Sequence, residues 1–262
     1  MSGTQGPVRL EVAERIAILT IDNPPANALD RATLQALGDA FQRALDDPAV
    51  KVILLTTAGD IGCAGANIRE LAALCGSQEA EALSRRGQAL AELIERSPKP
   101  VIGAIGGRFV LGGGYELFLA CHLRLVEERT QLGSPEVLLG LMVGWGGSQR
   151  LPRLVGLGRA TELLLTGRRI SAEEAHRIGL VNRVAKDGAV LEEALGLARN
   201  LAALSAPVLA ATLDALRVGA REGFSRGLEV ETARFAALCG NEDWREGTRA
   251  FLEKREPRFR DG

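Results

Sequence analysis

The sequence contains few of the residues that several common enzyme chemistries require. Its 262 residues include two histidines, one tyrosine and two tryptophans, and aromatic residues make up 4% of the chain. The histidines, His122 and His176, are far apart, and no triad or metal-binding motif surrounds either of them. A Ser-His-Asp triad or a zinc site in this chain would need one of these histidines. We therefore expect neither kind of site, and we expect no bound metal.

Closely spaced cysteine pairs are also missing. The four cysteines, Cys63, Cys75, Cys121 and Cys239, form no Cys-x-x-Cys motif. Three of them lie in apolar or helical contexts, where a reduced cysteine acts as a small apolar side chain. This pattern is typical of proteins from reducing compartments. We therefore expect the protein to be cytoplasmic.

The chain has no strong excess of either charge. Lysine and arginine number 32 and aspartate and glutamate 33, which gives a net charge of −1. Nucleic-acid binders usually have a positive excess and aromatic stacking residues, so we expect no nucleic-acid partner. No apolar run reaches the ~18 residues of a membrane span, and Met1–Pro7 lacks the pattern of a signal peptide. We expect no membrane partner either.

Apolar periodicity predicts strands that alternate with helices in the first part of the chain. Strands are expected at Val8–Val12, Ile16–Ile21, Val50–Thr56, Pro100–Ile105, Leu123–Val126 and Gln131–Leu132, and long helices from an Asp30 cap to Leu45 and from a Ser77 cap to near Ser97. After about Gly146 the pattern becomes almost wholly helical. This alternation indicates an α/β core followed by a helical tail, with a weakly marked boundary near residues 190–205.

One segment combines glycines with a carboxyl group in an apolar run. Gly112–Gly114 precede Tyr115–Ala120, a predicted buried helix that contains Glu116. Glycines leave backbone N–H groups open to a ligand, and a helix N-terminus favours a negative oxygen. A second carboxyl, Glu136, precedes the apolar residues Val137–Leu139. Two carboxyls near backbone donors indicate proton transfer beside a stabilised oxyanion.

The same residues also have structural interpretations. The glycines, taken singly, fit tight turns. One of the two glutamates also fits a buried structural acid paired with an arginine, such as Arg150. The residues by themselves leave these alternatives open.

Seven motifs, in order along the chain, resemble those of one family. They are Asn23-Pro24-Pro25-Ala26-Asn27-Ala28-Leu29, Cys63-Ala64-Gly65-Ala66-Asn67-Ile68, Gly112-Gly113-Gly114-Tyr115-Glu116-Leu117, Pro135-Glu136-Val137-Leu138-Leu139-Gly140, Gly146-Gly147-Ser148-Gln149-Arg150-Leu151, Leu165–Ala175 with Gly179-Leu180-Val181, and Phe251-Leu252-Glu253-Lys254-Arg255. They cover nearly the whole chain, which is thereby similar to the crotonase superfamily, the enoyl-CoA hydratase/isomerase group. The ordered set is far more specific than any one motif.

The resemblance implies a fold and an assembly. Members have a β-β-α spiral core of roughly perpendicular sheets and a C-terminal helical region. The acyl-CoA-binding spiral core is then expected over residues 1–200, and the helical oligomerisation region over residues 201–262. The family usually forms homotrimers or dimers of trimers, so we expect a homotrimer or homohexamer.

The resemblance also implies a chemistry. Members act on a coenzyme A thioester whose oxygen becomes enolate-like and is bound by two backbone N–H groups, here those of Ala66 and Gly113. In hydratases one glutamate activates water and a second protonates C2, and these positions match Glu116 and Glu136. Both are present, which favours an enoyl-CoA hydratase of fatty acid β-oxidation. Isomerisation, retro-aldol cleavage and decarboxylation stay open, as does, less favoured, the RNA binding reported for some members. Coenzyme A is then part of the substrate, and we expect no permanently bound cofactor.

Further positions match the substrate-binding segments of the family. By position they are Pro25, Ala26, Ala64, Asn67, Ile68, Arg69, Val143, Trp145, Lys254 and Phe259. Lys254 and Phe259 resemble C-terminal residues that reach the ligand of a neighbouring subunit. Asn67, Val143 and Trp145 stand where aspartate, proline and a small residue are common. The resemblance therefore implies an unusual acyl preference.

Overall fold

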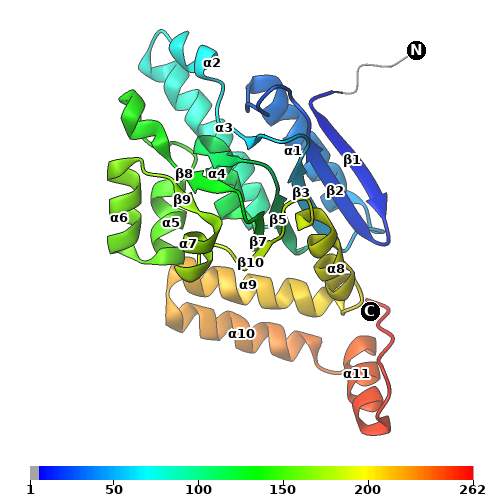
Figure 1. The fold of residues 1–262 in the computed structure, drawn as a ribbon. Coiled ribbons are helices and arrows are strands. Elements are labelled where there is room, and N and C mark those ends of the chain that lie inside the picture. Colours follow the sequence, from blue (N-terminus) through cyan, green and yellow to red (C-terminus); the bar gives the residue numbers. More distant parts are fainter. Residues whose placement is uncertain (1–5, 262) are drawn as a thin grey trace, which may run out of the picture.

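A computed structural model describes residues 6–261 of the chain. Residues 1–5 and Gly262 lie outside the described residues. The expectation that Met1–Pro7 is not a signal peptide therefore falls mostly outside them. The described part is built on two β-sheets with helices packed around them (Figure 1).

Six strands form the larger sheet. In spatial order they are β1 (Val8–Ala13), β2 (Ile16–Ile21), β3 (Val52–Thr57), β5 (Val101–Ile105), β7 (Leu123–Glu127) and β10 (Arg183–Ala185). β1 and β2, both expected as strands, pair as an antiparallel hairpin, and the other neighbouring pairs are parallel. Parallel strands need long crossover connections, which the intervening helices provide.

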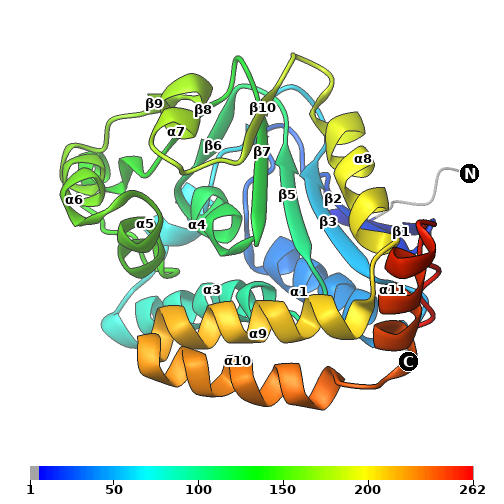
Figure 2. The ribbon, with the colours of Figure 1, turned by 90° about the horizontal axis from the view of Figure 1, so that it is seen from below.

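Alternate residues of these strands are buried on opposite faces of the sheet. Leu19 and Leu55 pack in a cluster with α1 (Arg31–Asp46), whereas Leu54 packs with α8 (Val190–Ala202). Figure 2 shows α8 lying along one side of the sheet. Burial on both faces explains why β3 and β5 are mainly apolar instead of alternating with polar residues.

The two long helices of the first half begin in different ways. Asp30 caps α1 as predicted, since its side chain accepts a hydrogen bond from Thr33 N at 2.8 Å. The predicted Ser77 cap is wrong, because Ser77 is the first residue of α3 (Ser77–Glu95) and extended Gly76 occupies the cap position. Gly76 has no side-chain acceptor, and Glu79 instead accepts a hydrogen bond from the backbone N–H of Cys75 at 2.8 Å.

The smaller sheet has four short strands that lead toward the site. In order they are β4 (Gly62–Cys63), β6 (Phe109–Leu111), β8 (Gln131–Gly133) and β9 (Ile170–Ser171). The sequence predicts β8 but not β4, β6 or β9. Strands of two or three residues are usually too short to show an alternating pattern. β6 continues directly into α4 (Gly112–Ala120), and every residue of α4 is buried.

Five short helices complete this part of the structure. They are α2 (Ile68–Ala72), the 3-10 helix η1 (Pro135–Leu139), α5 (Gly147–Val155), α6 (Leu157–Thr166) and α7 (Ala172–Arg177). α5 packs against α4, and α6 packs against both α5 and η1. These contacts bring the segments around residues 113, 136 and 147 together.

The chain ends in the helical tail that the sequence predicts. Its helices are α9 (Ala206–Glu222), α10 (Phe224–Leu238) and α11 (Glu242–Glu253). α9 and α10 lie side by side in Figures 1 and 2, and a Cβ on Gly227 would lie 2.8 Å from the Cα of Gly219. The predicted division at residue 200 falls in the last turn of α8 and stays a prediction.

The final residues return to the hairpin at the start of the chain. Asp261 accepts hydrogen bonds from Arg15 Nη2 at 2.5 Å and from Ala206 N at 2.9 Å, and it lies 2.6 Å from Lys51 Nζ. The end of the chain thereby joins the helical tail to the sheet. Within residues 6–261, no single helix is long and apolar enough to cross a membrane. Taken together, α8 and α9 have the length and composition of a membrane-spanning segment, but the two helices are bent by 107° relative to each other.

Candidate active site

A cavity of about 780 Å³ brings the predicted catalytic residues together. Ala66, Gly113, Glu116 and Glu136 all line it, although they come from separate segments of the chain. Much of the remaining wall comes from α3, the loop between η1 and α5, and the start of α5. The volume is typical of a small-molecule site, about 300–1,000 Å³. The described residues hold no group of three or more His, Cys, Asp and Glu side chains placed to bind a metal ion.

Two backbone segments of the wall carry N–H groups outside the regular hydrogen-bond pattern. Gly65 O and Asn67 N bond to Leu29 in a parallel bridge, and strand alternation leaves the Ala66 N–H outside that bridge. Gly113 is the second residue of α4, where N–H groups have no partner within the helix. A Cβ on Gly65 would lie 3.3 Å from Gly113 N, and the φ of +97° at Gly65 also favours glycine. The arrangement offers two backbone donors at one place in the cavity.

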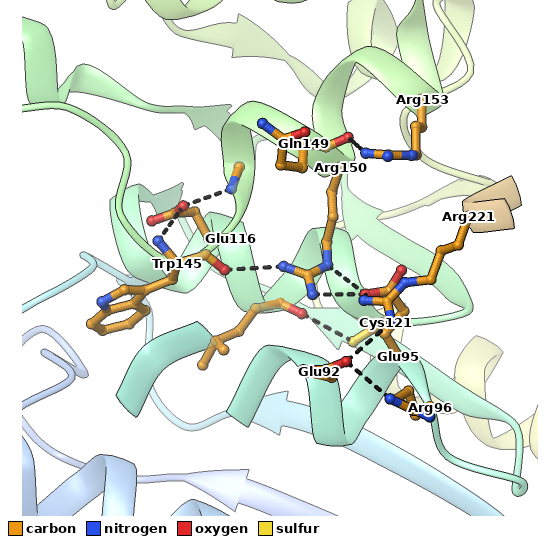
Figure 3. A network of polar contacts seen from close by, with 12 residues as sticks. Glu92, Glu95, Arg96, Glu116, Cys121, Trp145, Gln149, Arg150, Arg153 and Arg221 are labelled. Atoms are coloured by element: carbon orange, nitrogen blue, oxygen red, sulfur yellow. Dashed lines mark hydrogen bonds and ion pairs between the residues drawn. The ribbon is translucent and has the colours of Figure 1, made fainter. Parts of the chain in front are cut away.

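Glu116 is held by the turn between η1 and α5. It is 2% exposed, and its Oε1 accepts hydrogen bonds from Trp145 N at 2.8 Å and Gly147 N at 2.7 Å (Figure 3). Its Oε2 accepts a longer one from Gly144 N at 3.4 Å. A Cβ on Gly147 would lie 3.0 Å from Oε1, so the glycine permits this close approach. Three donors fix the carboxyl in one orientation and favour its ionised form.

Glu136 lies on η1 and lines the same cavity. A Cβ on Gly112 would lie 3.3 Å from Glu136 Oε1, so the carboxyl lies against the glycine turn. Its Oε2 is buried and has no hydrogen-bond partner among the described residues. The apolar side chains of Val137–Leu139, which follow Glu136, are exposed in the single chain. The burial of Glu136 therefore comes from the glycine turn and the cavity wall.

The two carboxyl groups differ in proton affinity. Burial raises the pKa of Glu136 to about 7, and the negative charge of Glu116 adds to the rise. Burial also raises the pKa of Glu116, but its three backbone donors and the charge of Arg150 oppose that rise. Two such carboxyls favour a state that holds one proton between them. Glu136 is better suited to carry the proton, and Glu116 is better suited to stay ionised.

Trp145 forms part of the cavity wall and is 4% exposed. A Cβ on Gly87 of α3 or on Gly113 of α4 would overlap the indole ring. The two glycines thus form the slot that the ring fills. Val143 lines the same cavity. Two of the predicted departures from the family pattern therefore lie beside the predicted catalytic residues.

Six predicted substrate-binding residues lie outside the cavity wall, on two adjoining segments: Pro25, Ala26, Ala64, Asn67, Ile68 and Arg69. Ala64 N donates a hydrogen bond to Ala26 O at 3.0 Å, which joins the segments. Ala66 connects this surface to the cavity. Asn67 caps α2 by accepting a hydrogen bond from Arg69 N at 3.0 Å. Asparagine and aspartate cap helices equally well, so the departure at Asn67 keeps this local structure.

Lys254 and Phe259 lie near the end of the chain. Lys254 ends α11, and Phe259 packs on the same helix, where a Cβ on Gly247 would lie 3.3 Å from the Phe259 ring. Among the described residues, the cavity wall of their own chain does not include either side chain. Their predicted contact with the ligand of a neighbouring subunit stays a prediction.

An ionic network beside the cavity is not apparent from the sequence. Arg150 Nε and Nη2 donate to Glu95 Oε2 at 3.0 and 2.7 Å, and Arg221 Nη2 donates to the same atom at 3.3 Å (Figure 3). Arg221 also donates to Glu92 at 3.0 Å. The alternative in which Arg150 pairs with one of the site glutamates is wrong, because Arg150 pairs with Glu95. Only the spacing of Glu92 and Glu95 on one helix face hints at the network.

Comparisons with known proteins identify the family of this chain. The sequence model of the enoyl-CoA hydratase/isomerase family matches residues 11–262. A probable enoyl-CoA hydratase of Bacillus subtilis strain 168 is 43% identical over 254 residues, which covers 97% of this chain and 98% of the relative. A crotonyl-CoA hydratase of Syntrophomonas wolfei is 42% identical over 254 residues, which covers 95% of this chain and 96% of the relative.

Solved structures show the same fold. The crystal structure of an enoyl-CoA hydratase from Bacillus anthracis matches with a TM-score of 0.93 at 34% identity, covering 98% of this chain and 100% of that chain. A Geobacillus kaustophilus structure matches with a TM-score of 0.94 at 30% identity, covering 99% and 98%. The predicted α/β, crotonase-like fold and the family resemblance are thus confirmed. The chain belongs to the enoyl-CoA hydratase/isomerase family, and it is an enzyme of this kind.

Proposed function

We propose that the protein is an enoyl-CoA hydratase, which adds water across the 2,3 double bond of an enoyl-CoA thioester. One observation carries the proposal: the carboxyl groups of Glu116 and Glu136 share a cavity with two backbone N–H donors, those of Ala66 and Gly113. Family membership supports it, since relatives that are 42% and 43% identical are named as hydratases.

In this proposal, each group has one task. The Ala66 and Gly113 N–H groups bind the thioester oxygen, which becomes negative as C3 is attacked; one such donor is typically worth about 2.7–4 kcal/mol. Ionised Glu116 accepts a proton from water as the water oxygen bonds to C3. Protonated Glu136 gives its proton to C2, and the double bond becomes single. Passage of the proton from Glu116 back to Glu136 restores the starting state.

Coenzyme A enters as part of the substrate, so the reaction needs no permanently bound cofactor. We place its nucleotide along the surface formed by Pro25, Ala26, Ala64, Asn67, Ile68 and Arg69. In a homotrimer or a dimer of trimers, Lys254 and Phe259 of a neighbouring subunit would complete this surface. A cytoplasmic location and a role in β-oxidation belong to the same proposal, and the four free cysteines are consistent with that location.

Hydration of crotonyl-CoA tests the proposal. We expect the absorbance of the conjugated thioester to fall when enzyme is added, with formation of a 3-hydroxyacyl-CoA. The sister reactions give other products, namely a shifted double bond, cleavage fragments or carbon dioxide. Formation of one of these from a panel of acyl-CoA thioesters, without any hydration, would overturn the proposal.

The pH dependence of kcat/KM should report the carboxyl pair. Both a base and an acid are required, so the active enzyme has one proton on the pair. Because the pKa of Glu136 is about 7, kcat/KM should fall as the pH rises above this value, since Glu136 then loses the proton it donates. Hydration neither takes up nor releases protons overall, so its equilibrium constant does not depend on pH. The pH profile of kcat/KM for dehydration of the product should therefore have the same shape.

A Glu136→Gln variant provides the check on this profile. It should have greatly reduced hydration and no longer show the alkaline decline near pH 7. A flat wild-type profile from about pH 6 to 9 would contradict the assignment of the pair, as would an unchanged profile in the variant.

Replacement of Trp145 by alanine should change the acyl preference without abolishing turnover. The indole fills a slot in the cavity wall, so its removal makes room for longer acyl groups, while the backbone N–H that holds Glu116 remains. The ratio of kcat/KM for long over short enoyl-CoA thioesters should rise by at least about tenfold. An alternative is that Trp145 packs in a subunit interface, but this does not account for its burial within the single chain.

Trp244→Ala is the matched control for this change. Trp244 lies on α11 and packs edge-on against Phe235, with ring centroids 5.3 Å apart. It is not part of the described cavity wall. We expect the chain-length ratio to stay unchanged in this variant. Equal shifts in both variants, or an unchanged ratio in Trp145→Ala, would remove Trp145 from the acyl pocket.

A further inference from the structure

Arg150 is connected to Glu116 through the backbone of one residue. The Trp145 N–H donates to Glu116 Oε1 at 2.8 Å, and the Trp145 carbonyl oxygen accepts a hydrogen bond from Arg150 Nη1 at 3.0 Å (Figure 3). The guanidinium also lies against Gly146, where any Cβ would overlap Nη1. Gly146 has a φ of +107°, a value that favours glycine. Arg150 therefore holds the turn that supplies the donors to Glu116.

Arg150 is itself held in place from the opposite side. Two of its guanidinium nitrogens donate to Glu95 Oε2, at 3.0 and 2.7 Å. The pair is partly shielded, with side-chain exposures of 11% for Arg150 and 25% for Glu95. Arg221 of α9 donates to the same oxygen at 3.3 Å. Charge-assisted bonds with several donors are stronger and more directional than a single exposed ion pair. These contacts hold the guanidinium in one position between α3 and the turn at Trp145–Gly147.

We propose that Arg150 is a positioning residue for Glu116: clamped by Glu95, it fixes the turn at Trp145–Gly147 and thereby the carboxylate that accepts the proton from water. The role of Glu116 in this inference rests on the proposed function. Arg150 takes no proton and acts through the turn. The alternative is that Arg150 binds the substrate, since its side chain also lines the cavity.

Arg150→Gln separates these two roles by kinetics. Loss of the clamp lets the carboxylate move, and a misplacement of about 1 Å can cost up to about 10²-fold in rate. We expect kcat for crotonyl-CoA hydration to fall by about 10- to 100-fold while KM changes less than about twofold. A rise in KM with unchanged kcat would assign Arg150 to substrate binding and overturn the proposal.

Arg168→Gln is the matched control. Arg168 is also held by two glutamates, donating to Glu162 at 2.8 Å and to Glu174 at 2.8 and 3.0 Å. It lies outside the described cavity wall. We expect this variant to retain kcat and KM even if its melting temperature falls. A loss of kcat equal to that of Arg150→Gln would show that the effect is one of general stability.

The acidic side of the pH profile provides a readout that a purely structural role would not move. Arg150 on α5 lowers the pKa of Glu116. The other charged group that faces Glu116 is Glu136 on η1, whose own pKa is raised by the charge of Glu116. Glu95 on α3 lies behind Arg150. Without the arginine, Glu116 should protonate more readily, so the acidic limb of kcat/KM should move to higher pH. Arg150→Lys should restore the position of this limb but only part of kcat, because lysine lacks the planar fork.

A double-mutant cycle tests whether Arg150 acts through Glu116. In a Glu116→Gln background, Arg150→Gln should cause little further loss, because the group that it positions is gone. Fully additive losses would overturn the proposal. If Arg150→Gln does not fold, Glu95→Gln replaces it in the kinetic measurements and should also lower kcat, because it releases the guanidinium while leaving its charge in place. An unchanged kcat in Glu95→Gln would overturn the proposal.

The failure of this inference can be distinguished from failure of the proposed function. Absence of wild-type hydration would overturn the function alone. The titration of Glu116 in the free enzyme, followed by carbon-13 NMR of labelled glutamate side chains and assigned with Glu116→Gln, does not depend on turnover. Its midpoint should rise in Arg150→Gln and stay unchanged in Arg168→Gln. An unchanged midpoint in Arg150→Gln would overturn the positioning role whatever reaction the enzyme catalyses.

Discussion

Replacement of Glu116 by glutamine should reduce crotonyl-CoA hydration by at least about 10²-fold while the fold stays intact. Glutamine has nearly the same shape, and its carbonyl oxygen can accept the hydrogen bonds that Trp145 N and Gly147 N now donate at 2.8 and 2.7 Å. An amide is too weak a base to accept a proton from water. The loss should therefore appear in kcat far more than in KM, and steady-state kinetics measure both.

Glu127→Gln provides a matched control for this variant. Glu127 is also buried, at 4% exposed, and also accepts backbone hydrogen bonds, from Gly107 N and Gly188 N, each at 3.0 Å. It lies at the end of β7, outside the described cavity wall. We expect a lower melting temperature and an unchanged kcat. If Glu116→Gln retained near wild-type turnover, Glu116 could not be the base.

Removal of the Gly113 N–H should have the second large effect, a loss of about 10²- to 10³-fold in kcat. Proline removes this donor, and the second position of a helix tolerates its φ. Any Cβ at 113 would, however, overlap the indole of Trp145. The comparison is therefore made in a Trp145→Ala background, between Gly113→Ala and Gly113→Pro. Both variants add a Cβ, and only proline removes the donor.

The difference between these two variants isolates the hydrogen bond. Gly113→Ala in the Trp145→Ala background should hydrate at a rate near that of Trp145→Ala alone. Gly113→Pro in the same background should be soluble, have the same oligomer size, and be far slower. Equal rates for the two would show that the Gly113 N–H does not hold the thioester oxygen. Equal inactivity would show that the added Cβ, not the donor, is responsible.

The central parts of the site could be predicted from the sequence because their signals are local. Glu116 stands out as a carboxyl within an apolar helix that follows three glycines, and the structure places it, buried, in the cavity wall. Five of the six strands of the larger sheet were predicted: β1 and β2 from alternating apolar residues, and β3, β5 and β7 from short, mainly apolar runs. β10 was not predicted, because its three residues show no pattern. The helices were predicted from apolar residues at helical spacing.

Other parts of the site depend on contacts between distant segments. Glu95 and Arg150 are 55 positions apart, and neither stands in a pattern that indicates the other. The exposure of Val137–Leu139 could not be predicted either, because an apolar run does not show whether its own chain covers it. The short strands of the smaller sheet are held by pairing with one another, and strands of two or three residues have no periodicity to detect.

If Trp145 lines the acyl pocket as proposed, the slot around it makes the side chains at positions 87 and 145 depend on each other. The indole occupies the space that a side chain on Gly87 of α3 would need. A lineage that exchanged Trp145 for a small residue would relieve the constraint on position 87, whereas a larger residue at 87 is incompatible with the tryptophan. Positions 87 and 145 are therefore expected to co-vary among relatives. Redesign of this enzyme for other acyl groups should treat them as one pair.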